Sequence, residues 1–359
     1  MARRVLGNDE ILFNVLMTLD TYLGRPRVSS LLSGVRERNL QRLLARAAEA
    51  QKTLPPEPEI PVRVDVTPEE FQRDYLEASR PIVLKGFAKS FPAVGRWSPE
   101  FFRDTFGDMR IQAVDGQGWA VEDSESGEAD VAVREMTLRE QVDRMLSGGS
   151  DYVSFWTELF TRHPELGKDI DVPALNKFIE PPRWTPDPIF KFFMGAGGTS
   201  TQWHCAELQN LFVQIHGTKE WRMCPPYWTP CMDPRVVSLQ QQYCHGMVDF
   251  RDPDIERYPL YAYAPQRRVV LEPGDVLYVP PFWWHCVMNP EVSIGLAVWW
   301  INLVPAARSH FTLFWLTVMS PQHIFRQVME RVQGKDHRTA VTASSIFKSH
   351  GVEVEKTDR

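Results

Sequence analysis

The fold of this chain is decided by residues 272–285, which read EPGDVLYVPPFWWH. Val276 to Val279 form a short apolar run that follows a Gly-Asp turn, and two prolines end it. This pattern predicts a short buried strand. The segment places one histidine, His285, at the end of a strand, beside a turn and next to bulky aromatic residues.

A second segment, residues 195–221, reads GAGGTSTQWHCAELQNLFVQIHGTKEW. Its glycine cluster lacks the Gly-Lys-Ser/Thr ending of a phosphate-binding loop, so we interpret it as a tight turn into the strand that carries His204. Imidazole is the commonest protein ligand of mid-row divalent metals. His204 and His285 are far apart in the sequence and can meet only if the sheet closes on itself. A histidine taken alone is more often a hydrogen-bonded core or rim residue.

Further short strands surround these two segments, with Gly/Pro turns between them. We expect strands at 81–87, 152–156, 190–194, 211–215, 220–224, 268–271, 276–279 and 293–300. Such spacing is typical of a β-sandwich or barrel. Helices are expected at 98–106, opened by Ser98-Pro99-Glu100, and at 137–147, starting at Thr137. The predicted fold class is mainly β with flanking helices.

The ends of the chain differ from this central part. Apolar residues at helical spacing predict an N-terminal helical arm over residues 1–53, and the proline-rich run 54–61 is expected to be a stiff linker. The barrel is expected at 62–303 and C-terminal helices at 304–333. The charged tail 334–359 is expected to be mobile.

Composition excludes several classes of protein. The 359 residues carry a formal net charge of −6, with 43% hydrophobic and 24% charged residues, which is typical of a globular protein and argues against bulk nucleic-acid binding. No apolar run approaches the ~20 residues that span a bilayer, so no membrane partner is expected. The five cysteines are sparsely spaced and the N-terminus shows no secretory signal. We therefore predict a cytoplasmic protein with reduced thiols.

The two segments resemble the JmjC-type, cupin-like family of iron(II)/2-oxoglutarate oxygenases, particularly the branch of the asparaginyl hydroxylase that inhibits hypoxia-inducible factor. The resemblance rests on the phrases GDVLYVPPFWWH and NLFVQIHGTKEW and extends from the strand at 81–87 to that at 293–300. It implies a double-stranded β-helix, a jelly roll with the metal in its mouth. Iron(II) and 2-oxoglutarate are the implied cofactors.

The resemblance also implies roles for particular residues. His204 and His285 would bind the iron. Thr201 and Lys219 would hold the distal carboxylate of 2-oxoglutarate, with Lys219 as its counter-charge, and Tyr152 would support that carboxylate. Asn210 falls where family members contact the other end of the cosubstrate.

The sequence departs from the family's metal motif, which is His-x-Asp or His-x-Glu and completes a facial triad. Here the triplet is His204-Cys205-Ala206, and the methyl group of Ala206 cannot bind a metal. Three interpretations stay open. Glu207 can supply the carboxylate, or chloride can fill the position as in the non-haem iron halogenases, or the barrel has lost catalysis and serves as a binding module.

The remaining residues receive simpler interpretations. Cys205 and Cys286 each follow a ligand histidine, so we expect packed thiols on the opposite face of their strands, close enough to form a pair. His216 and His245 are expected to be surface or loop histidines. Irregular segments at 114–130 and 228–266 are where we expect the choice of substrate to be made.

The predicted function is oxidation of an unactivated C–H bond, by hydroxylation or halogenation, in a small molecule or a protein side chain. Phe311, Phe314, Trp315, Val318 and Met319 form an apolar stripe in the C-terminal helices. The family resemblance implies a homodimer through these helices, and the alternative is burial of the stripe against the N-terminal helices.

Overall fold

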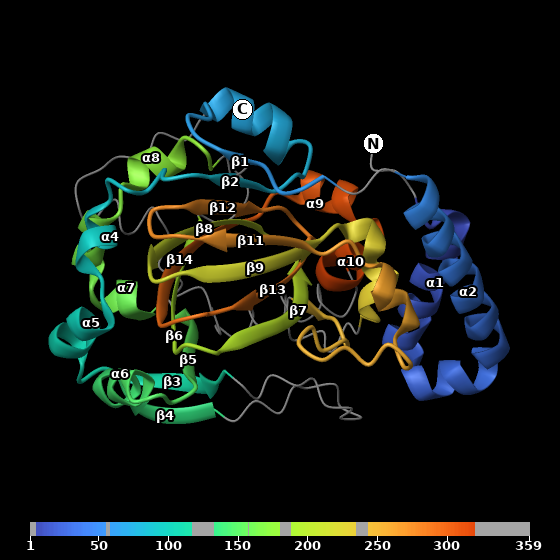
Figure 1. The fold of residues 1–359 in the computed structure, drawn as a ribbon, viewed down its shortest axis with the longest axis horizontal. Helices are drawn as coiled ribbons and strands as arrows, with labels where there is room; N and C mark the ends of the chain where they lie inside the picture. Colours follow the sequence, from blue (N-terminus) through green and yellow to red (C-terminus); the bar gives the residue numbers. More distant parts are fainter. Residues whose placement is uncertain are drawn as a thin grey trace, which may run out of the picture.

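Two β-sheets face each other at the centre of the structure, a computed structural model of the chain (Figure 1). It describes residues 5–54, 58–116, 133–156, 158–179, 188–234 and 243–319. The larger sheet has the order β1-β2-β12-β8-β14-β6-β5-β3-β4, and the smaller sheet has the order β10-β7-β13-β9-β11. Neighbouring strands are antiparallel except for the parallel pair β1 and β2.

The strands of the larger sheet are β1 (Val62–Arg63), β2 (Ile82–Leu84), β3 (Arg110–Asp115), β4 (Val133–Thr137), β5 (Asp151–Trp156), β6 (Ile189–Gly195), β8 (Gln209–His216), β12 (Val276–Val279) and β14 (Ser293–Trp300). Those of the smaller sheet are β7 (Ser200–Ala206), β9 (Lys219–Cys224), β10 (Tyr243–His245), β11 (Arg267–Leu271) and β13 (Trp284–Met288).

Alternation along the strands divides the apolar residues into three layers. One cluster covers the outer face of the larger sheet, a second covers the outer face of the smaller sheet, and a third lies between the two sheets. In β8, for example, Leu211 and Val213 belong to the outer cluster while Phe212 belongs to the interior. Two facing sheets with side chains filling the space between them confirm the predicted jelly roll.

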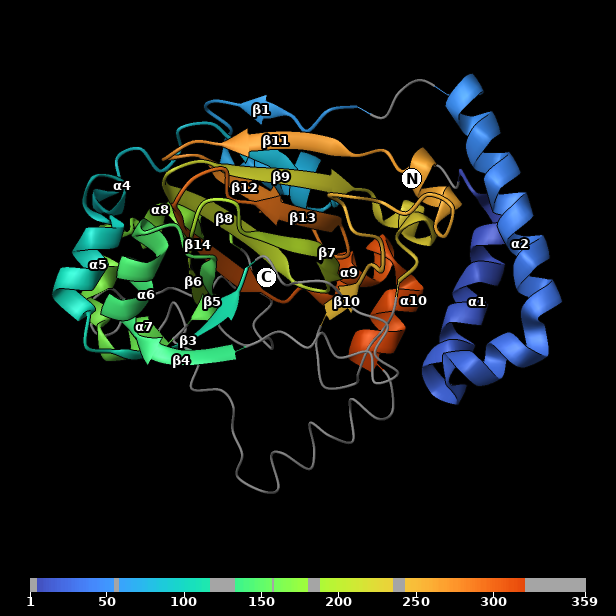
Figure 2. The same ribbon diagram turned by 60° about the horizontal axis from the view of Figure 1, so that its bottom comes forward.

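Helices lie at both ends of the sheets (Figures 1 and 2). The long helices α1 (Gly7–Leu23) and α2 (Arg25–Thr53) pack together at one end, and α4 (Pro92–Arg96), α5 (Pro99–Phe106), α6 (Leu138–Leu146) and α7 (Glu158–Arg162) lie at the other. The remaining helical segments are α3 (Pro68–Phe71), η1 (Gln72–Leu76), η2 (Pro164–Asp169), α8 (Val172–Asn176), η3 (Pro226–Met232), η4 (Pro259–Tyr263), α9 (Leu303–Ser309), α10 (Phe311–Phe314) and η5 (Trp315–Met319).

Both predicted short helices begin where their caps place them. Ser98 accepts a hydrogen bond from the backbone N–H of Phe101 at the start of α5. Thr137 and Glu140 form a reciprocal capping box at the start of α6. These caps satisfy backbone donors that a helix start would otherwise leave unpaired.

The sequence did not predict strands β1, β3, β4, β10 and β13. Parts of other predicted segments, namely residues 55–57 of the linker, most of 114–130, and 320–359 with the charged tail, lie outside the described residues. The division of the chain into an arm, a linker and a barrel stays a prediction. None of the described helices combines the length and the apolar character that crossing a membrane requires.

Candidate metal and cosubstrate site

Three histidines lie side by side across the smaller sheet. His204 of β7 pairs in register with His285 of β13 on one side and with His245 of β10 on the other. Cross-strand partners project from the same face of a sheet, so the three imidazoles share one face. The ring centroids of His204 and His285 are 4.1 Å apart, and those of His204 and His245 are 6.4 Å apart. The structure therefore brings together the two histidines that the sequence analysis selected.

Hydrogen bonds fix the tautomer of the first two rings. Nδ1 of His204 lies 2.8 Å from the carbonyl oxygen of Gln202, and Nδ1 of His285 lies 2.8 Å from that of Trp283. Because a carbonyl only accepts, each Nδ1 donates its hydrogen. Burial lowers the pKa of both imidazoles, which keeps the rings neutral, so each Nε2 retains the lone pair that a metal ion needs.

The neighbouring residue Glu207 lies just past the end of β7 and is buried. Burial, Cys244 and Glu207 together raise the pKa of the Cys205 thiol, and Cys205 belongs to the cluster on the outer face of the smaller sheet. Burial also raises the pKa of Glu207 to about 7. Oε2 of Glu207 makes no hydrogen bond, and among the described residues this carboxylate forms no three-ligand group with His204 and His285.

Lys219 is the buried cation of the barrel interior. Its side chain is 1% exposed, and its Nζ donates a 2.7 Å hydrogen bond to Oδ1 of Asn289. The ammonium also lies 5.4 Å from the ring centroid of Phe212 and 5.7 Å from that of Tyr152. Among the described residues no carboxylate pairs with it. Burial lowers its pKa to about 7, and a bound anion would restore its charge.

Two other predicted cosubstrate residues present polar atoms without partners. Oγ1 of Thr201 and Oδ1 of Asn210 are buried and make no hydrogen bond. His204 and Thr201 are three residues apart on β7, so regular alternation would point their side chains to opposite faces. A bulge between β7 and β13 lies between their two pairings, so this rule does not apply to the pair. Buried polar atoms without partners are costly, and a ligand with carboxylate and keto oxygens would satisfy them. The residues present therefore fit 2-oxoglutarate.

Glycine makes room for the aromatic rings around Lys219. A Cβ on Gly195 would lie 2.2 Å from the ring of Tyr152, its partner in register, and a Cβ on Gly295 would lie 2.2 Å from the ring of Phe212. Either contact is too short for a real side chain. Both glycines are thus required for the rings to pack where they do.

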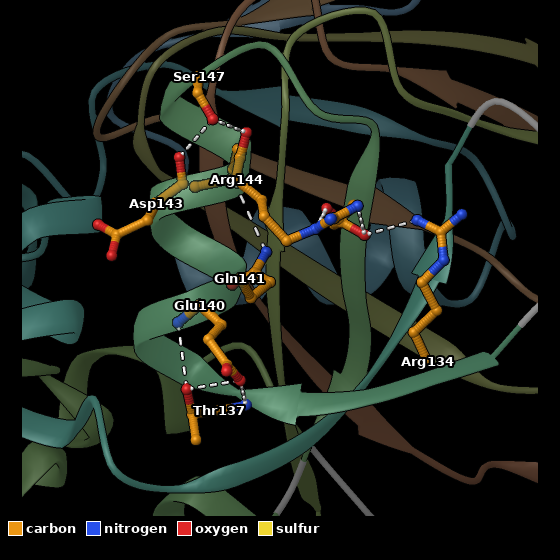
Figure 3. A network of polar contacts seen from close by, with 9 residues as sticks. Arg134, Thr137, Glu140, Gln141, Asp143, Arg144 and Ser147 are labelled. Atoms are coloured by element: carbon orange, nitrogen blue, oxygen red, sulfur yellow. Dashed lines mark hydrogen bonds and ion pairs between the residues drawn. The ribbon is translucent and has the colours of Figure 1, made fainter.

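A charged network holds the strand that carries Tyr152. Asp151, the preceding residue, is fully buried, and its carboxylate lies 2.7 Å from Nε of Arg144 and 3.3 Å from Nη1 of Arg134. Figure 3 shows Arg144 of α6 and Arg134 of β4 reaching toward each other from opposite sides of this contact. The network ties β4, β5 and α6 together.

Sequence reasoning was wrong about His245, while the closeness of Cys205 and Cys286 stays a prediction. His245 lies in strand β10 and is mostly buried, and burial together with His204 lowers its pKa to about 4. A three-residue strand has too short a pattern to be recognised from sequence. The thiol beside Cys205 is that of Cys244, its register partner. All five cysteines are buried and none of them forms a disulfide bond, as packed thiols should be.

Comparison with known proteins agrees with this fold. The cupin-like domain matches residues 68–304, which is well over half of the chain. The protein therefore belongs to the cupin-like family.

Several curated relatives have names that report an activity. "Lysine-specific demethylase 8" of Danio rerio is 27% identical over 257 residues, which cover 70% of this chain and 61% of its own. "Bifunctional peptidase and (3S)-lysyl hydroxylase JMJD7" of Homo sapiens is 27% identical over 279 residues, 69% of this chain and 85% of its own. "tRNA wybutosine-synthesizing protein 5" of Gallus gallus is 25% identical over 263 residues, which cover 69% of this chain and 79% of its own.

The chain spans between 50% and 61% of the length of the first three curated relatives. These relatives agree with the family resemblance seen in the sequence. They do not select the asparaginyl hydroxylase branch, and that narrower resemblance stays a prediction.

Proposed function

We propose that this protein is an iron(II)/2-oxoglutarate-dependent oxygenase. The observation that carries the proposal is Lys219, a fully buried ammonium with no carboxylate partner among the described residues, located in the same interior as the two tautomer-fixed histidines. A buried charge requires a counter-charge. The demethylase and hydroxylase names of the relatives support the same class of reaction.

The chain's own residues would divide the work as follows. Nε2 of His204 and Nε2 of His285 hold the metal, and Lys219 with Thr201 holds the distal carboxylate of 2-oxoglutarate. Asn210 contacts the keto-acid end, and the Tyr152 ring packs beside the ammonium. When bound, iron(II) and 2-oxoglutarate would allow dioxygen to act as the oxidant, with one oxygen atom passing to succinate as 2-oxoglutarate loses carbon dioxide and the other oxidising a substrate C–H bond. The apolar interior excludes water from that chemistry.

Halogenation is a second candidate, favoured by one observation. Ala206 stands at the position of the carboxylate ligand, and its methyl group cannot bind a metal. Chloride bound at this position would complete the metal's ligands and would be transferred in place of a hydroxyl group. The non-catalytic binding module is the remaining alternative.

The charge of the interior indicates the kind of substrate group it accepts. On strands β6–β9 and β11–β14, some positions lie on the same face as the interior cluster, an even number of residues from its members. These positions carry the basic residues Lys191, Lys219 and Arg267, but no Asp or Glu. Lys191 lies over the ring of Trp299 and Arg267 over that of Trp283. A lysyl ammonium buried here would meet like charge. We therefore propose a neutral or anionic target group, in a protein side chain or a small molecule.

Peptides test this charge preference directly. We expect lysyl peptides to leave the rate of succinate formation from 2-oxoglutarate unchanged, while a peptide or metabolite with a neutral or acidic target raises it. Stimulation by a lysyl peptide to the same extent as by its glutamine counterpart would contradict the proposed preference.

The experiment that tests the activity itself is anaerobic absorption spectroscopy of the protein with iron(II) and 2-oxoglutarate, with and without chloride. Chelated 2-oxoglutarate gives a weak visible charge-transfer band, so the substrate need not be known. We expect a band that disappears in His204→Ala and Lys219→Met and persists in the control His163→Ala, whose imidazole lies in the distant helical layer beside Phe106.

The response to chloride separates the candidates. A band that shifts with chloride supports halogenation, and Ala206→Asp should then remove the shift. A band indifferent to chloride supports hydroxylation, and Ala206→Asp should then raise the rate of uncoupled 2-oxoglutarate turnover. No band at millimolar iron and cosubstrate would contradict the oxygenase and favour the binding module.

A further inference from the structure

His245 is the histidine that the proposed activity leaves without a role. It lies in β10, directly across from His204, and its neighbour Cys244 faces the outer cluster. Because adjacent residues of a strand point to opposite faces, the His245 ring points to the same interior face as His204 and His285. Three neutral imidazoles thus line one row of the smaller sheet.

Ala206 lies next to this row. It pairs in register with Tyr243, two residues before His245, so His245 and Ala206 are diagonal neighbours on one face. Diagonal neighbours across antiparallel strands are within reach of long side chains. Ala206 occupies the position at which the family's motif has a metal-binding carboxylate. A histidine on the adjacent strand therefore lies beside this position.

We propose that His245 is the third protein ligand of the metal, so that the site is a three-histidine site rather than two histidines and a carboxylate. This inference rests on the proposed function, because it requires a metal ion at His204 and His285.

The distances define how far the His245 ring must move. With metal–nitrogen bonds of about 2.1 Å, two imidazoles on adjacent positions of one metal ion have centroids roughly 4.5 Å apart. The His204–His285 separation of 4.1 Å is close to this value, and the His204–His245 separation of 6.4 Å is longer. Among the described residues no three ligands already surround one point. His245 must therefore swing inward by roughly 2 Å relative to His204, and by more relative to His285, which lies one strand further away across β7.

Hydrogen bonding allows this movement for His245 and not for the other two rings. Nδ1 of His204 and of His285 donates to a backbone carbonyl, which holds each ring in place. Nδ1 of His245 is buried and has no hydrogen-bond partner. Rotation of that ring breaks no bond at Nδ1, and the small methyl group of Ala206 leaves the neighbouring position free of a competing carboxylate.

The test is anaerobic calorimetric titration of the full chain with Co(II), together with X-ray absorption spectroscopy to count the coordinated imidazoles. Neither measurement depends on turnover. We expect three imidazoles in the unaltered protein and two in His245→Ala, with Co(II) bound roughly tenfold to a hundredfold more weakly in the variant. The matched control His216→Ala, at the end of β8, should bind as the unaltered protein does.

A second variant distinguishes the loss of a metal ligand from a loss of folding in His245→Ala. In Ala206→Asp/His245→Ala, the new carboxylate replaces the missing ligand, so the affinity for Co(II) should return. If the double variant stays as weak as His245→Ala, the loss came from altered packing and the assignment of His245 is wrong.

The outcomes also separate this inference from the proposed function. If His245→Ala binds Co(II) as tightly as the unaltered protein while His285→Ala does not, His245 is no ligand and the oxygenase proposal stands. If the unaltered protein binds no Co(II), the oxygenase proposal fails and the inference fails with it.

Discussion

Lys219 carries the pH dependence that we expect of cosubstrate binding. Burial lowers the pKa of its ammonium from 10.5 to about 7, so the free protein loses this proton as the pH rises through neutrality. A bound carboxylate favours the charged form and raises that pKa. Binding must then take up a proton, and the affinity for 2-oxoglutarate should fall by up to about tenfold per pH unit above pH 7.

Calorimetry in two buffers of different ionisation enthalpy measures this proton uptake. We expect uptake of nearly one proton at pH 8 and little at pH 6. Lys219→Arg is the control, because a guanidinium stays protonated at both pH values. Equal affinity of the unaltered protein at pH 6 and pH 8, with no proton uptake, would show that the ammonium is not the counter-charge.

The lowered pKa of Lys219 also makes the stability of the ligand-free protein depend on pH. Between pH 7 and 10.5 the unfolded chain keeps a proton on Lys219 that the folded chain releases. The free energy of unfolding therefore rises with pH over this range and is lowest below it. A saturating anionic ligand should reduce this dependence, because it raises the pKa in the folded state.

At the scale of single elements, strand β5 is held by the buried carboxylate of Asp151. Asp151→Asn keeps the shape but removes the charge that Arg134 and Arg144 contact. Both arginines are about half exposed and can turn to water, so we expect a loss of about 1–3 kcal/mol in the free energy of unfolding. Urea unfolding measures it, and the affinity for 2-oxoglutarate should fall as well, because Tyr152 follows Asp151.

Asp143 provides a matched control in the neighbouring helix. Its carboxylate is half exposed and forms only a long contact of 3.6 Å with Arg103, and a surface contact of this kind contributes little. Asp143→Asn should change the free energy of unfolding by less than about 0.5 kcal/mol. An equal loss in both variants would mean that the network in Figure 3 does not stabilise β5.

The sequence was sufficient to predict elements with long or capped patterns. Most barrel strands are apolar runs bounded by Gly/Pro turns, and α5 and α6 begin at recognisable caps. The pairing of His204 and His285 came from the family resemblance, because strand register between distant segments is a tertiary property. The direction of Glu207 was beyond prediction for a physical reason. It follows the last residue of β7, and alternation gives no rule past the end of a strand.

Strand β10 shows the same limit more clearly. Its three residues have no periodicity of their own, and they become a strand only because β7 supplies hydrogen-bond partners. The sequence analysis therefore treated 228–266 as irregular and His245 as a loop residue. Tertiary pairing of this kind can be seen only in the folded chain.

For the whole molecule, the apolar stripe of the C-terminal helices is divided between two faces. Of the stripe, Phe314 and Val318 pack in one cluster with Met17 and Leu43 of the N-terminal helices, as one of the two alternatives predicted. Phe311 and Trp315 lie on the other face and are 66% and 40% exposed. Residues four apart share one side of a helix, so burial against the N-terminal helices covers only part of the stripe.

We propose that this uncovered face joins two copies of the chain. Exposed aromatic residues grouped on one helix face favour association, and a twofold-symmetric dimer pairs the same patch on both copies. In Phe311→Glu/Trp315→Glu, two carboxylates would repel their counterparts across the axis and oppose dimer formation. Because neither side chain belongs to the buried cluster, we expect the variant to fold and to bind 2-oxoglutarate normally.

Sedimentation velocity over a concentration series measures the association. The unaltered full chain should sediment as a dimer and the double variant as a monomer. A control, Leu31→Glu, changes an equally exposed apolar residue of α2 that lies outside the stripe, and it should remain dimeric. If the unaltered chain is a monomer at every concentration, no second copy covers Phe311 and Trp315, and the homodimer is wrong even though the jelly roll and its site are unaffected.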